Sequence, residues 1–219
     1  MSRFVALAGN IGVGKTTACN ILAEELGYRQ LREPVLDNRF LRPYYKDMSR
    51  WSFTLQMEFL LKRTEHHRQV HLEEQGYIQD RTLIEDPEVF AKYLHGLGHM
   101  TDSELDLYFD YCRMLLPQIA QPDAIVFLGC SDINVLLRRI AERGRTEESG
   151  ITARFLRGLD HYYATFPDVC EQKYNLPTLT IDVTSLDIRT NKGRNEFASR
   201  VRTFLSEALP AKDGSGRLF

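Results

Sequence analysis

The strongest constraint in this sequence is a glycine-rich segment close to its start. Residues 9–17 read GNIGVGKTT and fit the pattern G-x-x-x-x-G-K-[ST]. The apolar run Arg3–Ala8 precedes it and predicts a buried strand, whereas Lys15–Leu26 has helical spacing and stops before Gly27. Glycines let several backbone N–H groups converge on one anion, and a helix N-terminus adds its positive end. The segment therefore predicts a phosphate-binding loop, with a chance glycine-rich turn as the alternative.

Two residues of this loop match positions with defined chemistry. A lysine at the position of Lys15 reaches the β- and γ-phosphates of a nucleoside triphosphate, and a hydroxyl at the position of Thr16 binds Mg²⁺. We therefore expect a nucleoside triphosphate and Mg²⁺ at this loop. The predicted nucleotide-binding residues are Gly9, Asn10, Ile11, Gly12, Val13, Gly14, Lys15, Thr16 and Thr17.

Short apolar runs alternate with helical patterns along the rest of the chain. Further strands are predicted at Tyr28–Arg32, Gly76–Asp80, Ala124–Leu128 and Leu179–Val183. Helices are predicted at Ser52–Glu74, Pro87–Leu94, Asp102–Leu116, Asp132–Glu142, Ile151–Lys173 and Asn195–Leu209, with a loop at Asp37–Arg50 and a polar break at Arg143–Gly150. This order predicts an α/β fold of the P-loop NTPase type, in which helices flank a five-stranded parallel sheet in three layers. Residues 1–209 would form one domain and 210–219 a flexible tail.

Composition narrows the classes of function. The chain of 219 residues carries 28 Lys and Arg against 30 Asp and Glu, and this balance argues against a nucleic-acid polymer as partner. The longest apolar run, Ala124–Leu128, is far too short to span a membrane, and a strand predicted almost at Met1 leaves no room for a targeting segment. The four cysteines are scattered and include no CxxC pair. We therefore expect a cytoplasmic protein without membrane association.

Charged residues follow two of the predicted strands, where parallel sheets bind their ligands. Glu33 precedes a proline at the end of the second strand and is placed to accept a proton from a hydroxyl, although a solvated loop acid is the alternative. Asp80 ends the third strand and is placed to help hold Mg²⁺. Arg81 follows it and would neutralise a phosphoryl group or pair with Glu33, with a surface ion pair as the alternative.

A dense basic stretch lies at the end of one predicted helix. Arg139 and Arg143 share a helical face, and Gly144 then frees the chain before Arg145. Such arginines suit a lid, at about residues 143–151, that closes over a transferring phosphate. The alternative is a solvated helix end that Glu142, Glu147 and Glu148 neutralise.

A second group of residues suits a nucleobase. Gln56 and Arg63 lie two turns apart on one predicted helix face, and both side chains suit hydrogen bonds to base edges. Flat rings suit base faces, and Tyr44, Tyr45, Trp51 and Phe53 lie near the start of this helix. The alternative is that the rings belong to the core and that Gln56 and Arg63 are solvated.

Two histidine pairs are candidate metal ligands. The pair His67 and His71 lies among charged residues, which predicts a wet polar helix face. Glycines interrupt the pair His95 and His99. Since neither pair has an evident third ligand, we expect no metal site at either.

Five segments in this order resemble the deoxynucleoside kinase family, the relatives of deoxycytidine, deoxyguanosine and deoxyadenosine kinases. They are GNIGVGKTT, LREP, RWSFTLQ, DRT followed by IEDPEVF, and RGRTEESGI, and the resemblance extends from about Arg3 to Leu209. It implies ATP as phosphoryl donor, a deoxynucleoside as acceptor, and a homodimer packed through helices such as Ser52–Glu74.

The resemblance also implies roles for single residues. Glu33 matches the general base for the sugar 5′-hydroxyl, Arg81 the arginine that steadies this base and the phosphoryl charge, and Lys15 is the third implied catalytic residue. Thr16 and Asp80 match positions at Mg²⁺, and Arg139, Arg143 and Arg145 match lid arginines on the triphosphate. The residues implied in substrate binding are Glu33, Tyr45, Trp51, Gln56, Arg63, Arg81, Asp86, Phe90 and Glu148.

Within this set the family assigns different parts of the substrate to different residues. Tyr45 and Glu148 match residues that bind the 3′-hydroxyl, and Phe90 matches a ring that stacks on the base. Gln56, Arg63 and Asp86 match the base edge, and the Arg63/Asp86 pair argues against thymidine. The segment DRT departs from the ERS or DRS of many members, and Pro87 stands where several animal members have arginine. We therefore expect a purine deoxynucleoside first and deoxycytidine next.

Two other functions are alternatives for a chain with this pattern. A nucleoside monophosphate kinase of the same sheet type would bind its acceptor phosphate through arginines and would have no use for Glu33 as a base. A non-catalytic scaffold would be expected to lose Lys15, Glu33 or the lid arginines, all of which are present.

Overall fold

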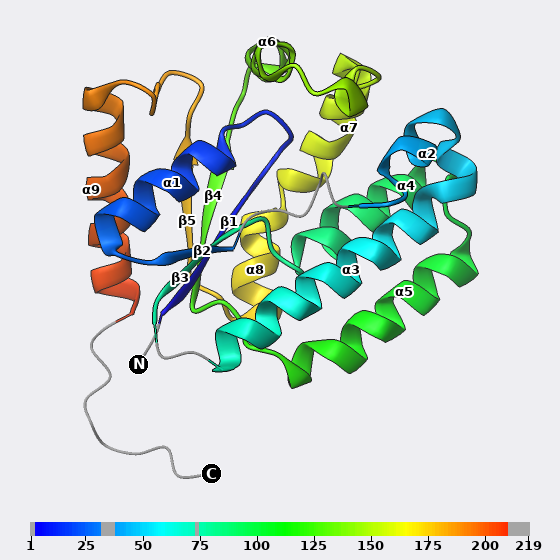
Figure 1. Cartoon of the computed structure of the whole chain (residues 1–219), viewed down its shortest axis with the longest axis horizontal. Coiled ribbons are helices and arrows are strands. Elements are labelled where there is room, and N and C mark those ends of the chain that lie inside the picture. The colour runs from blue at the N-terminus through cyan, green and yellow to red at the C-terminus, as the bar shows by residue number, and fades with distance from the viewer. Residues whose placement is uncertain (1–2, 32–37, 73–74, 210–219) are drawn as a thin grey trace.

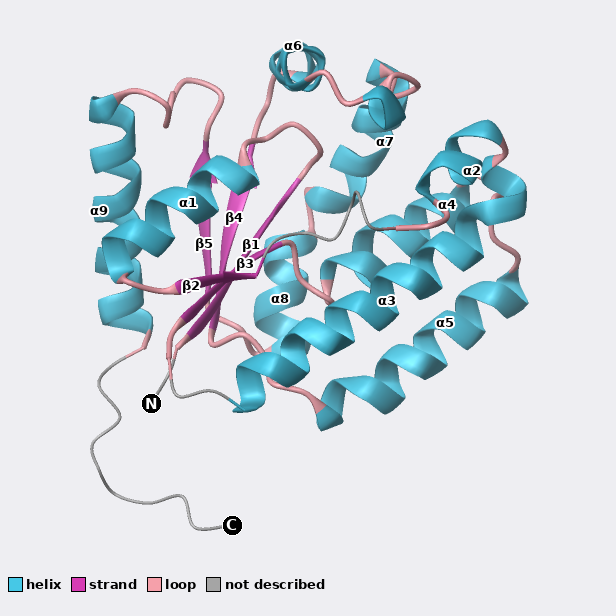
Figure 2. Cartoon of the chain, viewed as in Figure 1, coloured by secondary structure: helices cyan, strands magenta, loops and turns pink. Residues whose placement is uncertain are grey.

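The computed structural model describes residues 3–31, 38–72 and 75–209. Within them a five-stranded, all-parallel sheet has the strand order β2-β3-β1-β4-β5 (Figure 1, Figure 2). The strands are β1 (Phe4–Gly9), β2 (Arg29–Leu31), β3 (Tyr77–Asp80), β4 (Ala124–Gly129) and β5 (Thr178–Asp182). This confirms the predicted fold class and each predicted strand to within one or two residues. Arg32, the predicted end of β2, lies outside the described residues.

The two central strands explain why the sheet is covered on both faces. Every residue of β1 is buried, as are the first five of the six residues of β4, because parallel strands of this kind contact helices on either side. Val5 and Leu7 point to one face, where α1 (Lys15–Leu26), α6 (Ile133–Arg143) and α9 (Asn191–Ala208) pack. Ala6 and Ala8 point to the other, where α7 (Ala153–Tyr163) and α8 (Phe166–Tyr174) pack.

A separate helical cluster extends from one side of the sheet (Figure 1). It consists of α2 (Leu41–Lys46), α3 (Met48–Leu72), α4 (Lys92–Gly96) and α5 (Asp102–Leu115), which share a third hydrophobic core. Thr101 caps α5 in a reciprocal arrangement with Glu104. The far end of α3 contacts the starts of β1 and β3, and the cluster also packs on Leu83 and η1 just after β3. The candidate site lies between this cluster and the loop after β1.

One predicted loop contains helical structure. Within the predicted loop Asp37–Arg50, α2 occupies Leu41–Lys46 and α3 begins at Met48. Leu41 and Tyr44 are buried in the third core, and this burial outweighs the loop-like composition of the segment. Pro43 is tolerated because it lies in the first turn, where a backbone N–H has no helical partner.

Two other helix predictions were partly wrong. The predicted helix Ile151–Lys173 is divided into α7 and α8, because Pro167 has no N–H to donate to the Tyr163 carbonyl and so cannot continue α7, whereas it is tolerated in the first turn of α8. The predicted helix Pro87–Leu94 begins as a π-helix, η1 (Asp86–Ala91), before it continues as α4. Short 3₁₀ turns, η2 (Leu116–Gln118) and η3 (Thr146–Glu148), complete the elements of the described chain.

Three further observations bear on the sequence analysis. The four cysteines are buried, and none forms a disulfide within the described residues. None of the helices that the structure describes combines the length and apolar character needed to cross a bilayer. The predicted tail 210–219 and the predicted base Glu33 lie outside the described residues.

Candidate active site

A cleft of about 410 Å³ opens at the carboxyl ends of the strands. Its walls come from the loop after β1, α2, the middle of α3, the end of β3, η1, the end of α6 with η3, the start of α7 and the segment that precedes α9. The glycine-rich loop and the predicted base-binding residues thus face one cavity, although they come from distant parts of the sequence.

The glycine-rich loop contains backbone conformations with positive φ, which residues other than glycine adopt only with strain. Gly9 and Gly12 have φ values of 141° and 81°. A Cβ atom would also collide at both positions, 2.5 Å from the Leu128 carbonyl oxygen at Gly9 and 2.8 Å from the Leu136 carbonyl oxygen at Gly12. Because glycine has no Cβ, the chain can approach β4 and α6 this closely.

The Lys15 side chain is folded back into the loop. Its Nζ donates to the carbonyl oxygens of Gly9 at 2.7 Å and Asn10 at 3.0 Å, and the residue is 6% exposed. The Asn10 amide donates to the carbonyl of Leu156 in α7 at 3.0 Å and so anchors the loop. Of the predicted nucleotide-binding residues, Ile11 to Thr17 line the cleft, whereas Gly9 and Asn10 lie behind it.

Two oxygen ligands, one at the start of α1 and one at the end of β3, fit the predicted magnesium site. Thr16 Oγ1 donates to Asp80 Oδ2 at 2.6 Å, and both residues line the cleft beside the loop. A hydroxyl and a carboxylate are ligands that Mg²⁺ accepts, with water and phosphate oxygens filling its other positions. In the described chain no set of three or more His, Cys, Asp or Glu side chains gathers as a metal site.

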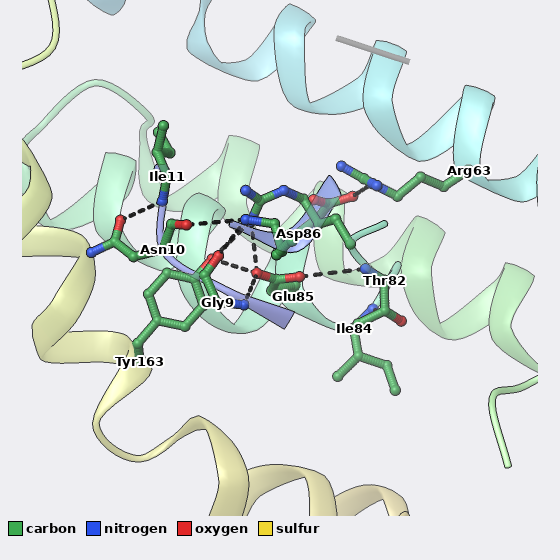
Figure 3. Close-up of polar contacts among 11 residues, drawn as sticks. Gly9, Asn10, Ile11, Arg63, Thr82, Ile84, Glu85, Asp86 and Tyr163 are labelled. Carbon is green, nitrogen blue, oxygen red and sulfur yellow. Dashed lines mark hydrogen bonds and ion pairs between the residues drawn. The ribbon is translucent and has the colours of Figure 1, made fainter. Parts of the chain in front are cut away.

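Arg81 follows Asp80 in a left-handed conformation, with φ of 70°. Its Nη1 donates to Glu85 Oε1 at 2.7 Å and to the Tyr163 hydroxyl at 2.8 Å, and its guanidinium lies 4.6 Å from the centroid of the Phe90 ring. Figure 3 shows Glu85 and Tyr163 pointing toward one another beside Gly9. The sequence analysis missed both Glu85 and Tyr163. An acid four residues after the arginine was a visible signal for Glu85, but Tyr163 had none.

The predicted Arg63/Asp86 pair is formed and deeply buried. Arg63 Nε donates to Asp86 Oδ2 at 2.5 Å, and the two residues are 1% and 2% exposed (Figure 3). Burial raises the pKa of Asp86 to about 6, although the positive charges of Arg63 and Arg81 oppose this rise. Both residues line the cleft, as does Gln56, whose buried Oε1 accepts no hydrogen bond from the described residues.

Aromatic and apolar side chains complete the part of the cleft next to this pair. Tyr45 and Phe90, both predicted, are joined there by Tyr44, one of the rings predicted to suit a base face, and by four residues that were not predicted, Leu41, Leu55, Phe59 and Phe155. Trp51 does not line the cleft. Its ring stacks on Phe40 at 5.6 Å between centroids, and the Arg50 guanidinium lies 4.8 Å from it.

The predicted lid arginines line the other side of the cleft. Arg143 Nη2 and Arg145 Nη1 lie 2.6 Å and 3.3 Å from the carboxylate of Glu148, which is 6% exposed. Arg139 instead donates to the carbonyl oxygens of Val13 and Val183, at 3.0 Å and 3.2 Å, and so connects the glycine-rich loop to the end of β5. Asp187, Ile188 and Arg189 also line the cleft and were missed.

The wet polar face predicted for the first histidine pair is wrong at His67. This side chain is fully buried, its Nδ1 lies 2.7 Å from the Ala120 carbonyl oxygen, and burial lowers its pKa to about 4. In the second pair, His95 Nε2 contacts Asp102 at 2.7 Å and His99 Nδ1 contacts Ser49 at 2.9 Å.

The fold and this cleft define a nucleotide-binding protein of the P-loop class. The family model for deoxynucleoside kinases matches residues 5–206, and the chain belongs to this family. It is 34% identical over 146 residues to a deoxyadenosine/deoxycytidine kinase of Bacillus subtilis, a match that covers 66% of this chain and 67% of that protein. A deoxyguanosine kinase of the same organism is 29% identical over 92% of this chain and 97% of its own length.

A solved structure of a deoxyadenosine kinase is also similar to this chain. Deoxyadenosine kinase from M. mycoides, with the products dCMP and dCDP bound, superposes with a TM-score of 0.79. It is 27% identical to this chain, and the match covers 91% of this chain and 99% of that one. A second structure of that enzyme contains dATP and has a TM-score of 0.77.

Proposed function

We propose that this member of the family transfers the γ-phosphoryl group of ATP to the 5′-hydroxyl of a purine deoxynucleoside, with deoxycytidine as the next best acceptor. The observation that carries the proposal is the single cleft that both the glycine-rich loop and the Arg63/Asp86 pair line. Phosphoryl transfer needs donor and acceptor aligned in one site, and catalysis consists mainly of positioning and charge stabilisation.

On the donor side, the backbone N–H groups of the loop and the Lys15 ammonium would bind the triphosphate. Arg143 and Arg145 would move from Glu148 to the phosphates, as lid residues do. Mg²⁺ would be held by Thr16 and Asp80 and would neutralise phosphate charge there. The 2.6 Å contact between these two residues at the loop supports this assignment.

On the acceptor side, Glu33 is the proposed general base for the 5′-hydroxyl, on the strength of the family resemblance and its place after β2. Arg81 would stabilise the charge on the phosphoryl group. Tyr45 and Glu148 are proposed to bind the 3′-hydroxyl, and Phe90 to stack on the base. The cleft-lining position of these last three residues supports their roles.

The base preference follows from the charges next to Phe90. Ionised Asp86 accepts hydrogen bonds, which suits the exocyclic amino group of adenine or cytosine, while Arg63 and Gln56 offer donors for ring nitrogens and carbonyl oxygens. Guanine can donate to the carboxylate from its N1–H and 2-amino group and place its O6 against Arg63, whereas thymine has no exocyclic amino group to donate. The names of the relatives, which include adenosine-, cytidine- and guanosine-directed kinases, support this class of acceptor.

The proposed homodimer is supported by an exposed apolar face on α3 and α5. Leu61, Leu107, Tyr111 and Met114 are 53%, 45%, 38% and 53% exposed, and the three on α5 recur at helical spacing. A cytoplasmic location stays a prediction from the sequence.

A panel of acceptors tests the proposal. With ATP and Mg²⁺, we expect turnover to be fastest on deoxyadenosine or deoxyguanosine and slower on deoxycytidine, and we expect Glu33→Gln to abolish it. Fastest turnover on thymidine would overturn the base assignment. Faster turnover on deoxynucleoside monophosphates, with Glu33→Gln nearly as active as the parent, would instead favour a monophosphate kinase.

A further inference from the structure

The Glu85 carboxylate is a junction of three elements behind the cleft. It is fully buried, and its Oε1 accepts hydrogen bonds from the Gly9 backbone N–H at 3.1 Å, from Arg81 Nη1 at 2.7 Å and from the Tyr163 hydroxyl (Figure 3). Gly9 begins the phosphate loop, Arg81 follows β3, and Tyr163 ends α7. One oxygen atom therefore ties the arginine to the first residue of the loop.

The backbone of Arg81 shows that this arrangement has an energetic cost. A left-handed conformation is strained for a residue with a side chain, and it persists where the surroundings determine it. Here the Arg81 N–H donates to the Leu7 carbonyl oxygen at 2.9 Å, and its side chain is held by Glu85, Tyr163 and the Phe90 ring. Strain of this kind often accompanies a functional site.

We propose that Glu85 and Tyr163 are positioning residues that hold the Arg81 guanidinium at a fixed distance from the phosphate loop. The inference rests on the proposed function, in which Arg81 stabilises the transferred phosphoryl group between donor and acceptor. Glu85 fixes one edge of the guanidinium and, through Gly9, the start of the loop. Tyr163 accepts from Arg81 and donates to Glu85, so that the arginine is oriented before substrate arrives.

Two properties of the cluster support a positioning role. Burial holds the pKa of Tyr163 well above its usual range, so its hydroxyl remains a donor to Glu85 at any assay pH. A buried ion pair is by itself weak evidence for stability, because desolvation offsets much of the attraction between the charges. The contacts of Glu85 connect Arg81 to the phosphate loop. A pair that contributed only to stability would not need this connection.

The chain contains a matched control for Tyr163. The Tyr174 hydroxyl donates to Glu88 Oε1 at 2.7 Å, and Glu88 is 4% exposed and lies in the same π-helix as Asp86. Glu88 pairs with Lys92 and Lys173 on the side of η1 away from the cleft. Tyr163→Phe and Tyr174→Phe thus each remove one tyrosine hydroxyl from one buried carboxylate.

The first experiment compares these two variants. Loss of one oriented contact predicts a kcat about 10-fold lower in Tyr163→Phe, with the acceptor KM within about twofold. Tyr174→Phe should keep kcat within about twofold, although it also removes a hydrogen bond from a buried carboxylate and should lower Tm. An unchanged kcat in Tyr163→Phe, or equal losses of kcat in both variants, would overturn the proposal.

A second variant pair tests whether Tyr163 acts through Arg81. In an Arg81→Lys background, adding Tyr163→Phe should leave kcat within about twofold, because the fork that the hydroxyl orients is already gone. If the two substitutions lower kcat by the product of their separate factors, the proposal is overturned.

A readout without turnover separates this inference from the proposed function. In ¹⁵N NMR, exchange of the Arg81 guanidinium protons should be about 10-fold faster in Tyr163→Phe than in the parent, and unchanged in Tyr174→Phe. Unchanged exchange in Tyr163→Phe would overturn the positioning role. A parent chain that phosphorylates no deoxynucleoside would overturn the proposed function alone.

Discussion

The two sides of the cleft differ in whether main chain or side chains form them. The proposed donor side comes mostly from the main chain of one continuous segment, residues 9–17, in which glycines shape the loop and Lys15 is folded against its carbonyl groups. The proposed acceptor side comes from side chains on separate segments, among them Gln56 and Arg63 on α3, Arg81 after β3, and Asp86 and Phe90 on η1. A backbone cradle recognises what all triphosphates share, whereas separate side chains can change one at a time. We infer that selectivity in this enzyme depends on the acceptor side.

The largest expected effect tests the donor side. Lys15→Ala removes the one ammonium group within the loop, and loss of a charge that stabilises the transferring phosphoryl group should lower kcat on the order of 10³-fold. Because the loss is generic, it should be similar for deoxyadenosine and deoxycytidine. The measurement is steady-state turnover with each acceptor, and Lys192→Ala, an exposed lysine in α9, is the control. A loss confined to one acceptor would break the comparison.

A smaller effect, on the acceptor side, should depend on pH. The pKa of Asp86 is raised to about 6, so its carboxylate is ionised above that pH and neutral below it. Since the ionised form accepts from an exocyclic amino group, kcat/KM for deoxyadenosine should fall about 10-fold between pH 7 and pH 5. Asp86→Asn is the reference, because its kcat/KM, although lower, should lack this step. The same step in both proteins would assign it to another group.

The smallest effect distinguishes rings inside the cleft from rings beside it. Phe90→Leu should raise the acceptor KM about fivefold, because stacking on a base contributes roughly 1 kcal/mol. Trp51→Leu should change this KM by less than about twofold, since Trp51 packs on Phe40 instead. Equal increases in KM would show that the sequence prediction for Trp51 was sound and that the cleft extends to it when substrate binds.

Features that depend on neighbouring residues could be predicted from the sequence, whereas contacts between distant residues could not. The phosphate loop and the strands depend on neighbouring residues, so local patterns predicted them well. The contact between Glu85 and Tyr163 joins residues 78 positions apart, and local periodicity contains no information about it. Helix α2 was missed because burial of Leu41 and Tyr44, which depends on the third core, outweighed a loop-like composition. The roles of Glu33 and of the lid stay predictions.

The π-helix η1 has a consequence for how this site can diverge. Asp86 and Phe90 face the cleft from a stretch that is wound more loosely than an α-helix, and such stretches are often found at functional sites. Each residue of an α-helix turns the chain by about 100°. Deleting a single residue between Asp86 and Lys92 would therefore swing one of the two groups away from the substrate, while a point substitution would keep both in place. Insertions and deletions should accordingly be rare in this stretch among relatives, and changes in base preference should arise there by exchange of side chains at constant length.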